Sequence, residues 1–317
     1  MRVGLIGGGT DLPCYLAEYG IGGIISLAIN IYWHILIRKR PFDKNIVASY
    51  RKLEVQEDIE NLDNELIREC LKYYGIIESI EIHMCSDIST KGSGLGSSSS
   101  AISALALGLK KIKNHNIDKV SVAEIYDIEN KQLGAPIGIQ DHVATVHGGL
   151  NQIELISNSY SLMPFSPIVA KTITDHLMLI NTGIQRNSYE QLSPKNINTK
   201  EMHGIYDLYN DTVILLGKYP LNIFELARIV QEGWLIKRDS YKKCSNEEID
   251  SLYNTLIKEG ALGGKLCGSG GGGYLAIFVE DRTWFINKLK DKYVNIYSNT
   301  ITAEPDLEGT RVLYADA

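Results

Sequence analysis

Short β-rich apolar runs alternate along this chain with stretches in which apolar residues recur at helical spacing. The runs predict strands and the periodic stretches predict helices, which indicates an α/β or α+β architecture. The strands expected are Val3–Ile6, Ile24–Arg40, Ile80–Met84, Leu150–Ile156, Tyr160–Phe165, His176–Ile180 and Tyr274–Val279. The helices expected are Asp63–Tyr74, Ala101–Lys113, Val122–Leu133, Gly204–Gly217, Ile223–Lys237, Asn246–Glu259 and Arg282–Lys292. Leu150–Ile156 and Tyr160–Phe165 are expected to be strands of a hairpin that turns at Asn158.

The length of the chain favours two domains. At 317 residues it exceeds the usual size of a single core, so two packed domains that form a cleft are expected. Pro164 and Pro167 interrupt the pattern just before residues 168–172. We therefore expect one domain at 1–168 and a second at 169–317.

One long uncharged stretch raises the question of a membrane span. Gly20–Ile37 has no charged side chain apart from the titratable His34, and its length approaches the ~20 residues that cross a bilayer. Gly22, Gly23 and Asn30 interrupt it, and its β-branched residues favour two buried strands or one long bent strand. The N-terminus also lacks the basic-then-apolar order of a signal peptide. We expect no membrane insertion and a cytoplasmic protein.

Charge and cysteine content exclude other classes. The 32 Lys and Arg residues against 38 Asp and Glu give a net charge of -6 with no basic stripe, which argues against a nucleic-acid partner. Five scattered cysteines without paired spacing do not fit a disulfide framework and favour a reducing compartment. His142 and His147 are five residues apart, which suits no ligand pattern, so no structural zinc is expected. The sequence does not reveal the oligomeric state.

Three glycine clusters carry the candidate chemistry. Gly94–Ser100 runs into the apolar, alanine-rich segment Ala101–Leu109, as a loop does when it opens a helix. Free N–H groups at a helix N-terminus bind phosphate, and glycines let the phosphate approach the backbone. The alternative is a serine-rich helix cap after a flexible turn. The other clusters, Gly7–Asp11 and Gly268–Gly273, adjoin apolar runs and predict turns next to strands.

These motifs, in this order, resemble those of the sugar kinases of the GHMP superfamily, named for galactokinase, homoserine kinase, mevalonate kinase and phosphomevalonate kinase. The segments that carry the resemblance are Arg2–Asp11, Gly94–Ser98 and Gly268–Gly273, and it extends over nearly the whole chain. The heptokinase- and fucokinase-like branch is the most similar, through Gly7–Pro13, Ile139–Asp141 before Gly148-Gly149, Thr182-Gly183 with Arg186, and Gly260–Gly273. The resemblance implies two α/β domains with the active site between them.

The resemblance also implies the nucleotide site. ATP would bind to the phosphate loop, whose residues are Gly92, Ser93, Gly94, Leu95, Gly96, Ser97, Ser98 and Ser99. Ser98 and Glu129 match the family's Mg²⁺ ligands, and hard oxygen donors are what Mg²⁺ prefers. Asp141 matches the catalytic carboxylate, which accepts the proton of the attacking hydroxyl or orients it, and Arg2 matches the arginine beside that carboxylate. Apart from the resemblance, Asp141 reads as a helix cap.

The acceptor would be a sugar or a sugar phosphate. Residues expected to bind it are Gly8, Gly9, Thr10, Asp11, Asp141, Gly183, Arg186, Lys237, Gly270, Gly271 and Gly272. Asp11 would accept hydroxyl hydrogen bonds, unless it only forms an Asx turn. A phosphate on the sugar requires a cation, for which Arg186 comes first and Lys237 and Arg238 next. Lys265 would shape the cleft wall, or be a solvated lysine at a strand end.

Two departures from the family pattern bear on the site. Family members usually have several residues before the arginine, which here is residue 2, so either the start is trimmed or Arg2 lies on a loose terminus. Ser89 stands where the family commonly has proline, which should loosen the start of the phosphate loop.

The function expected is transfer of the γ-phosphoryl group of Mg-ATP to a sugar hydroxyl. The first choice is the anomeric hydroxyl of D-glycero-D-manno-heptose 7-phosphate, which would give the 1,7-bisphosphate for nucleotide-sugar and surface polysaccharide synthesis. The alternatives are an L-fucokinase or galactokinase-like enzyme for an unphosphorylated sugar, and a sugar-binding homologue without activity.

Two other nucleotide-binding folds fit the sequence poorly. A dinucleotide-binding oxidoreductase is disfavoured because the glycine spacing is incomplete and Pro13 stands where the first helix should run. A P-loop is disfavoured because Leu266 follows Gly264-Lys265.

Overall fold

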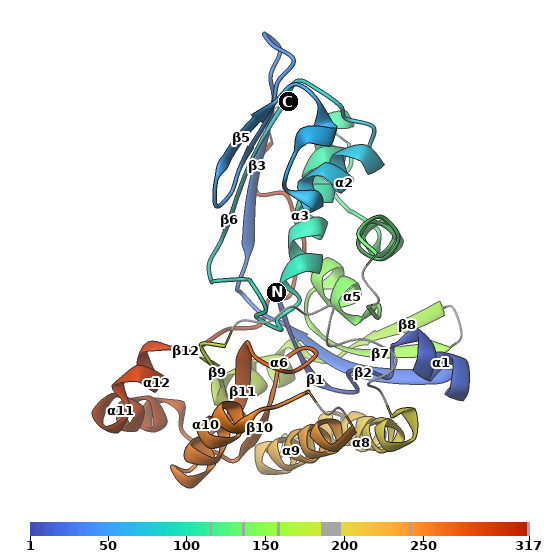
Figure 1. The fold of residues 1–317 in the computed structure, drawn as a ribbon. Helices are drawn as coiled ribbons and strands as arrows, with labels where there is room; N and C mark the ends of the chain where they lie inside the picture. The colour runs from blue at the N-terminus through green and yellow to red at the C-terminus, as the bar shows by residue number, and fades with distance from the viewer. Residues whose placement is uncertain (115, 135–136, 157–158, 185–197, 241–242, 316–317) are drawn as a thin grey trace.

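The computed structural model describes residues 1–114, 116–134, 137–156, 159–184, 198–240 and 243–315 as three four-stranded sheets with helices packed on them (Figure 1). The first sheet has the order β1 (Arg2–Ile6), β2 (Ile21–Ala28), β7 (Leu150–Ile156), β8 (Ser159–Pro164). The second has the order β10 (Gly263–Leu266), β11 (Tyr274–Phe278), β9 (Leu177–Asn181), β12 (Thr300–Ile301). The third has the order β3 (Trp33–Lys39), β6 (Ile80–Ser86), β4 (Ile46–Ser49), β5 (Leu53–Gln56). This mixture of helices and sheets confirms the expected α+β class.

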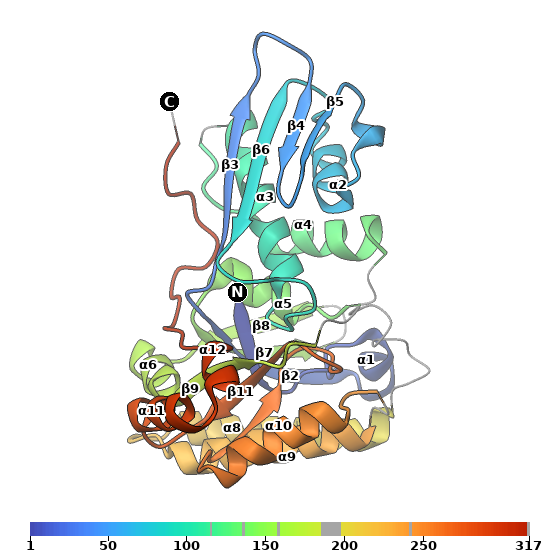
Figure 2. The same cartoon turned by 60° about the vertical axis from the view of Figure 1, so that its left-hand side comes forward.

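The helices join these sheets into an upper lobe and a lower part. They are α1 (Pro13–Tyr19), α2 (Glu65–Tyr73), α3 (Ser97–Lys113), α4 (Val122–Tyr126), α5 (Gln140–His147), α6 (Pro167–His176), α8 (Thr199–Leu216), α9 (Ile223–Ser240), α10 (Glu247–Lys258), α11 (Arg282–Lys292) and α12 (Val294–Ser298). A 3-10 turn at Ile59–Asn61 and a π-helical segment at Asp127–Gln132 complete the described elements. Figures 1 and 2 place the N-terminus where the lobe meets the lower sheets.

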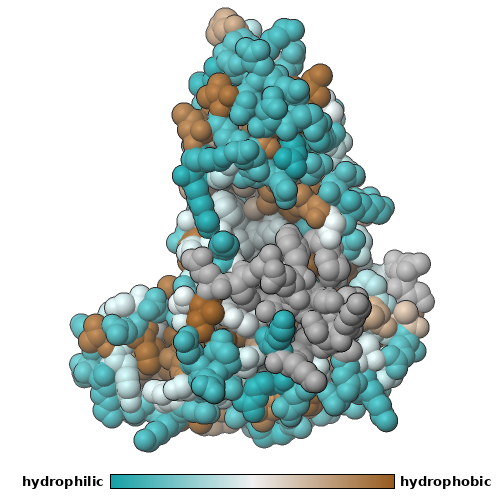
Figure 3. All heavy atoms as spheres, in the orientation of Figure 1, coloured by the Kyte–Doolittle hydropathy of each residue, from teal (hydrophilic) through white to brown (hydrophobic). Residues whose placement is uncertain are grey.

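The upper lobe is the sheet β3-β6-β4-β5 with α2 and α3 on one face (Figure 2). Apolar side chains from this face of the sheet and from both helices form one core, to which α3 contributes Ile102, Leu105 and Leu109, all fully buried. On the face drawn in Figure 3, hydrophilic residues predominate over the lobe and hydrophobic ones are scattered among them. The core therefore holds α3, and with it the phosphate loop, against the sheet.

The uncharged stretch forms two strands in different sheets. β2 is buried along nearly all its length, whereas β3 alternates between half-buried and exposed residues after the break near Asn30. The stretch therefore forms two strands, as one of the alternatives predicted, but only the first of them is buried. Among the described residues, no helix has the length and apolar character that a membrane crossing requires.

The first sheet lies between helices. α8 packs against β2 on one face, and α5 contacts β1 and β2 on the other. Gly23 of β2 is required by this packing, since a Cβ there would lie 2.2 Å from the ring of Tyr209 on α8. The glycine pair in β2 thus lets an aromatic helix face lie directly on the strand.

The C-terminal segment crosses back to α5. Pro305 forms an isolated bridge with Ile29, and the N–H of Thr310 donates to Thr145 O of α5 at 2.9 Å. Gly309 lies so close to α5 that a Cβ would come within 2.4 Å of Val146 O. The chain end therefore packs on the helix that carries Asp141.

Several expectations need correction. Pro13 does not prevent an early helix: it is at the first position of α1, where its missing N–H has no helical acceptor to lose. The helix expected at Val122–Leu133 divides into α4 and the π-helical segment. Strands β4, β5, β10 and β12 and helix α6 were not expected, and α6 contains the predicted boundary between residues 168 and 169. The expected turn at Asn158 lies outside the described residues.

Candidate active site

A cavity of about 880 Å³ lies between the upper lobe and the lower sheets. Of the residues expected in the site, those that line it are Arg2, Gly8, Gly9, Asp11, Gly92, Ser93, Gly94, Gly96, Ser97, Ser98, Glu129, Asp141 and Lys237. Thr10, Leu95, Ser99, Gly183, Gly270, Gly271 and Gly272 are not among the lining residues, and Arg186 lies outside the described residues. The structure thus brings together residues that are up to 235 positions apart, from Arg2 to Lys237.

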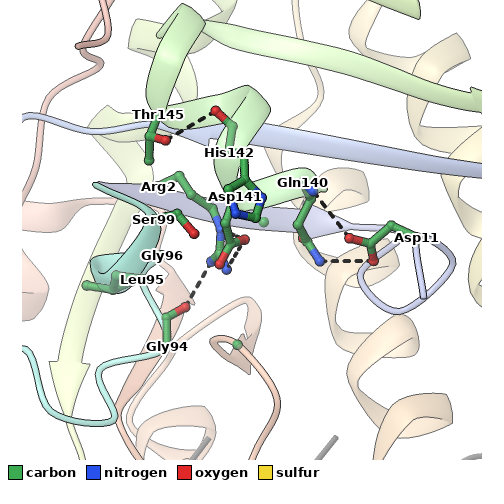
Figure 4. A network of polar contacts seen from close by, with 12 residues as sticks. Arg2, Asp11, Gly94, Leu95, Gly96, Ser99, Gln140, Asp141, His142 and Thr145 are labelled. Atoms are coloured by element: carbon green, nitrogen blue, oxygen red, sulfur yellow. Dashed lines mark hydrogen bonds and ion pairs between the residues drawn. The ribbon is translucent and has the colours of Figure 1, made fainter. Parts of the chain in front are cut away.

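Arg2 and Asp141, which both line the cavity, are in direct contact (Figure 4). Arg2 Nη2 lies 2.5 Å from Asp141 Oδ1, and Arg2 Nε donates to the same oxygen at 2.6 Å. Arg2 Nη1 donates to Gly94 O at 2.8 Å. One guanidinium therefore joins the carboxylate at the start of α5 to the phosphate loop.

Arg2 is not on a loose terminus. It is the first residue of β1, it pairs with Ala28 of β2, and only 4% of its surface is exposed. Its backbone N–H donates to Leu95 O at 3.0 Å. Because backbone and side chain are both held, these contacts fix the position of the guanidinium.

The phosphate loop depends on glycine. Gly94 and Gly96 have φ angles of 76° and 66°, in the left-handed region, and Gly96 is the N-cap of α3. A Cβ on Gly94 would lie 2.4 Å from Cys267 O, and a Cβ on Gly273 would lie 2.4 Å from Gly92 O. Gly273 of the last glycine cluster therefore packs directly against this loop, whereas Gly270 and Gly272 pack against Cys244 and Ile184, and none of Gly270–Gly273 lines the cavity.

The first turn of α3 faces the cavity. The N–H groups of Ser97, Ser98 and Ser99 have no acceptor within the helix, as at every helix N-terminus. These N–H groups and the helix dipole favour an anion. Trp33, which the sequence analysis did not single out, donates from Nε1 to Ser97 O at 2.9 Å and lines the cavity beside the loop.

Glu129 lies on the π-helical segment, in contact with the same serines. Glu129 Oε2 accepts from Ser99 Oγ at 2.6 Å and lies 2.9 Å from Nε2 of the buried His142. Burial opposes ionisation of this carboxyl, but His142 and the hydroxyls of Ser98 and Ser99 outweigh burial and lower the pKa of Glu129. An ionised carboxylate beside a serine hydroxyl is a donor set that suits Mg²⁺. No group of three or more His, Cys, Asp or Glu side chains poised for a metal occurs in the described part of the chain.

Asp11 is anchored at the other side of Asp141. The N–H of Gly9 donates to Asp11 Oδ1 at 3.2 Å, Gln140 Nε2 donates to Oδ1 at 3.2 Å, and the Gln140 N–H donates to Oδ2 at 3.3 Å. Burial raises the pKa of Asp11 and the charge of Asp141 adds to this, while the N–H donors of Gln140 and Gly9 act in the opposite direction. Gln140 is thus a site residue that the sequence analysis missed, although it adjoins Asp141.

Thr10 fixes the first glycine turn from behind. Its hydroxyl lies 2.9 Å from Gly7 O and accepts the N–H of Gly23 at 3.0 Å. Gly7 has a φ of 89°, and a Cβ there would lie 1.9 Å from Gly23 O. The buried Thr10 therefore shapes the turn that carries Asp11 and does not itself face the cavity.

Two lysines from the lower part complete the wall. Lys237 of α9 is buried and donates from Nζ to Gly268 O. Lys265 of β10 is only 9% exposed, so the alternative of a solvated strand-end lysine is wrong. Its Nζ donates to Gly4 O at 2.8 Å.

Comparison with known proteins assigns the fold to a family. The family model described as GHMP kinases N terminal domain matches residues 61–149, and the one described as GHMP kinases C terminal matches 222–295, together just over half of the chain. The chain is 28% identical to D-glycero-alpha-D-manno-heptose 7-phosphate kinase of Campylobacter jejuni over 88% of both chains. It is 24% identical to galactokinase of Pyrococcus furiosus over 89% of this chain and 88% of that one.

A solved structure gives the same result for the fold. The crystal structure of a D-glycero-D-manno-heptose 1-phosphate kinase from Bacteroides thetaiotaomicron superposes with a TM-score of 0.75 over 99% of this chain and 98% of that chain, at 22% identity. The expected fold, the mixed helix-and-sheet fold of the GHMP kinases, is confirmed.

Proposed function

Because this chain belongs to the GHMP kinases, phosphotransferases with a hydroxyl acceptor, we propose that it transfers the γ-phosphoryl group of ATP to a hydroxyl of a sugar. The observation that carries this proposal is the Arg2–Asp141 pair, which lies between the phosphate loop and Asp11. A nucleotide on one side and a polyol on the other would meet at this pair. Phosphoryl transfer needs such positioning and charge neutralisation above all.

The nucleotide half of the site would use the start of α3. The free N–H groups of Ser97, Ser98 and Ser99 would bind the phosphates, and the apolar walls formed by Trp33, Leu66 and Ala101 suit a base. Ser98 and Glu129 would hold Mg²⁺, which would neutralise phosphate charge when bound. The lowered pKa of Glu129 supports this, since it keeps the carboxylate ionised.

The chemical step would rest on Asp141 and Arg2. The Asp141 carboxylate would accept the proton of the attacking hydroxyl, or hold that hydroxyl in line with the γ-phosphorus. Arg2 would hold the Asp141 carboxylate in place and offset the negative charge that develops on the transferring group. Asp11, held by Gln140 and Gly9, would accept hydrogen bonds from further hydroxyls of the sugar.

The acceptor we propose is a heptose 7-phosphate, phosphorylated at its anomeric hydroxyl. The 28% identity to the Campylobacter heptose 7-phosphate kinase over 88% of both chains supports this choice. The buried Lys237 is a cation for the acceptor's phosphate, and Arg186 stays a prediction outside the described residues. The bisphosphate formed would serve nucleotide-sugar synthesis.

The similarity to galactokinase favours a second candidate, a kinase for an unphosphorylated sugar. A sugar-binding homologue without activity is disfavoured by the joint presence of Arg2, Asp141 and Glu129 in the cavity.

One experiment separates these candidates. ADP release from Mg-ATP is measured with D-glycero-D-manno-heptose 7-phosphate, the free heptose, L-fucose and galactose, and Mg-ADP binding is measured by calorimetry. Selective turnover of the heptose phosphate supports the proposal, and equal or better turnover of a free sugar supports the second candidate. Nucleotide binding without turnover of any sugar would refute the kinase proposal for this panel and favour the binding protein.

A further inference from the structure

Lys265 is a buried amine held at an irregularity of β1. The pairing of β1 with β2 shifts between Gly4 and Ile6, so Leu5 is an extra residue in the strand. Lys265 Nζ lies 2.8 Å from Gly4 O and 3.4 Å from Leu5 O, and it lines the cavity. The amine thus caps the two carbonyl groups at this bulge from the opposite sheet.

The hydrogen bonds of Lys265 suit a neutral amine. A neutral amine has two N–H groups, which match the two carbonyl acceptors, whereas an ammonium has a third that needs another acceptor. In the described part of the chain, no carboxylate forms an ion pair with Lys265. An ammonium at this depth therefore lacks a counter-ion of its own until a ligand brings one.

The groups around Lys265 also disfavour its charge. Burial lowers the pKa of Lys265 to about 7, and the charges of Lys237 on α9 and Arg2 on β1 act in the same direction. Cys267 and, to a smaller extent, Cys244 act in the opposite direction, and β11 places the apolar Ala276 beside Lys265 in register. The amine therefore holds a proton less tightly than an ordinary lysine, and a bound anion and the proton would each favour the binding of the other.

The position of Lys265 lies on the acceptor side of Asp141. Along β1, Arg2 contacts the phosphate loop through Gly94 and Leu95, and Gly4 is two residues farther toward the turn that carries Asp11. Lys265 contacts Gly4 and not the phosphate-loop end of the strand. An anion bound at Lys265 would therefore lie nearer to the expected position of the acceptor than to that of the nucleotide.

We propose that Lys265, together with Lys237, binds a phosphate group carried by the acceptor, and that Lys265 takes up a proton when this phosphate binds. This inference rests on the proposed function and adds the residue that selects a phosphorylated acceptor. The γ-phosphate of the nucleotide offers the same chemistry, and separate titrations distinguish the two sources.

The test is calorimetric titration of the full chain at pH 8, repeated in buffers of different protonation enthalpy. The probes are D-glycero-D-manno-heptose 7-phosphate, the free heptose, and the Mg complexes of ADP and of a non-hydrolysable ATP analogue. The heptose phosphate is expected to bind with uptake of about one proton, since a group of pKa near 7 is mostly neutral at this pH. The free heptose is expected to bind at least about tenfold more weakly and without uptake.

Two variants assign the proton to this residue. Lys265→Met should abolish the uptake and reduce the preference for the phosphorylated sugar at least about tenfold, while Lys44→Met, at an exposed lysine of the upper lobe, should leave both unchanged. Lys265→Arg, which stays charged, should bind the phosphate without uptake if the variant folds, as thermal unfolding would establish.

The outcomes separate this inference from the proposed function. Absence of proton uptake by the unchanged chain, or retention of uptake in Lys265→Met, overturns the role of Lys265 even where the heptose phosphate is the preferred substrate. Uptake with the ATP analogue but not with ADP or the sugar phosphate assigns the site to the γ-phosphate and overturns the acceptor subsite. Equal binding of both sugars with no uptake overturns the subsite and the phosphorylated acceptor together.

Discussion

Arg2 Nη2 lies 2.5 Å from Asp141 Oδ1, although the two residues are 139 positions apart in the chain. The side chain of Arg2 is 5% exposed and that of Asp141 is 24% exposed. The carboxylate is therefore accessible from the cavity, and the cation that holds it is buried. The same guanidinium bonds Gly94 O. The pair therefore couples the position of the carboxylate to the position of the phosphate loop, and each partner can be tested separately.

Asp141→Asn should lower kcat by at least about 10²-fold and leave the affinity for Mg-ADP nearly unchanged. The amide keeps the shape of the side chain, but it neither accepts a proton nor carries the charge that Arg2 neutralises. Steady-state kinetics and nucleotide titration measure the two effects. Asp175→Asn, on the exposed face of α6, is the control. Unchanged turnover would remove Asp141 from the mechanism.

Arg2→Lys should lower kcat about 10- to 100-fold with a small change in the KM for ATP. A single ammonium keeps the charge but does not bond both Asp141 and Gly94 O as the guanidinium does. Arg282→Lys offers a matched control, because Arg282 also bonds a backbone carbonyl, Thr174 O, at 2.8 Å and lies outside the cavity. Wild-type turnover of Arg2→Lys would show that charge alone suffices.

The parts of the fold that the sequence predicted are those with a strong local pattern. α2 and α3 lie close to their expected ranges, because their apolar residues recur at helical spacing and face one core. β10 was missed, since Gly263-Gly264-Lys265-Leu266 has little strand propensity and becomes a strand through its pairing with β11. The sequence therefore left open whether Lys265 lies in the cleft wall or in solvent, and the structure shows that it is buried.

The sequence singles out candidate site residues that lie together in one continuous motif. It misses those that only contacts between distant parts of the chain bring into the cavity. The phosphate loop is continuous in the chain, so its glycines and serines are visible together. The bond from Gln140 to Asp11 joins residues 129 positions apart, and only the fold brings them together. Gly270, Gly271 and Gly272 were expected to contact the substrate, but none of them lines the cavity, and a Cβ on Gly270 or Gly272 would collide with the backbone of Cys244 or Ile184.

Gln140→Leu should raise the KM for the sugar about tenfold, which corresponds to about 1.4 kcal/mol, with little effect on the KM for ATP. Leucine has a similar volume but removes the amide that donates to Asp11 Oδ1, so one of the groups that orient this carboxylate is lost. Kinetics with each substrate varied in turn measure the split. The control is Gln56→Leu on β5, in the upper lobe. An equal rise in both KM values would contradict a role confined to the acceptor.

The contribution of Glu81 to the free energy of unfolding should depend on pH, because its hydrogen-bond partners lower its pKa in the folded state. Hydrogen bonds from Arg38 and then His83, with a further contribution from Arg40, lower the pKa of Glu81 to about 2 from an ordinary value of 4.5. Since the folded pKa is the lower one, the stabilisation is complete above about pH 4.5 and is lost as the pH falls toward 2.

Glu81→Gln should accordingly lower the free energy of unfolding at pH 7 and lower it much less near pH 2. Urea unfolding of both proteins across this range measures the difference. Glu60→Gln, which removes a more exposed carboxylate paired with the single cation Lys72, should show a smaller difference. A difference that stays constant from pH 7 to pH 2 would mean that Glu81 acts through packing and not through its charge.

Gly138→Ala should weaken sugar binding while the fold is retained. A Cβ at this position would lie 1.8 Å from Asp11 Oδ2, so the carboxylate must move, and its three N–H donors from Gly9 and Gln140 hold it where it is. Displacement by more than 1 Å breaks hydrogen bonds of 3.2–3.3 Å, and a rise in the KM for the sugar of about 10- to 100-fold follows.

The matched control is Gly217→Ala at the end of α8, where the nearest atom to the new Cβ would lie at 3.6 Å and φ is -77°. This variant should keep both KM values and unfold at nearly the wild-type temperature. Because Gly138 adjoins the cavity and not the core, Gly138→Ala should also unfold within a few degrees of wild type. A normal KM for the sugar in Gly138→Ala would show that Asp11 does not contact the acceptor, whereas a normal KM for ATP beside a raised KM for the sugar assigns Asp11 to the acceptor side of Asp141.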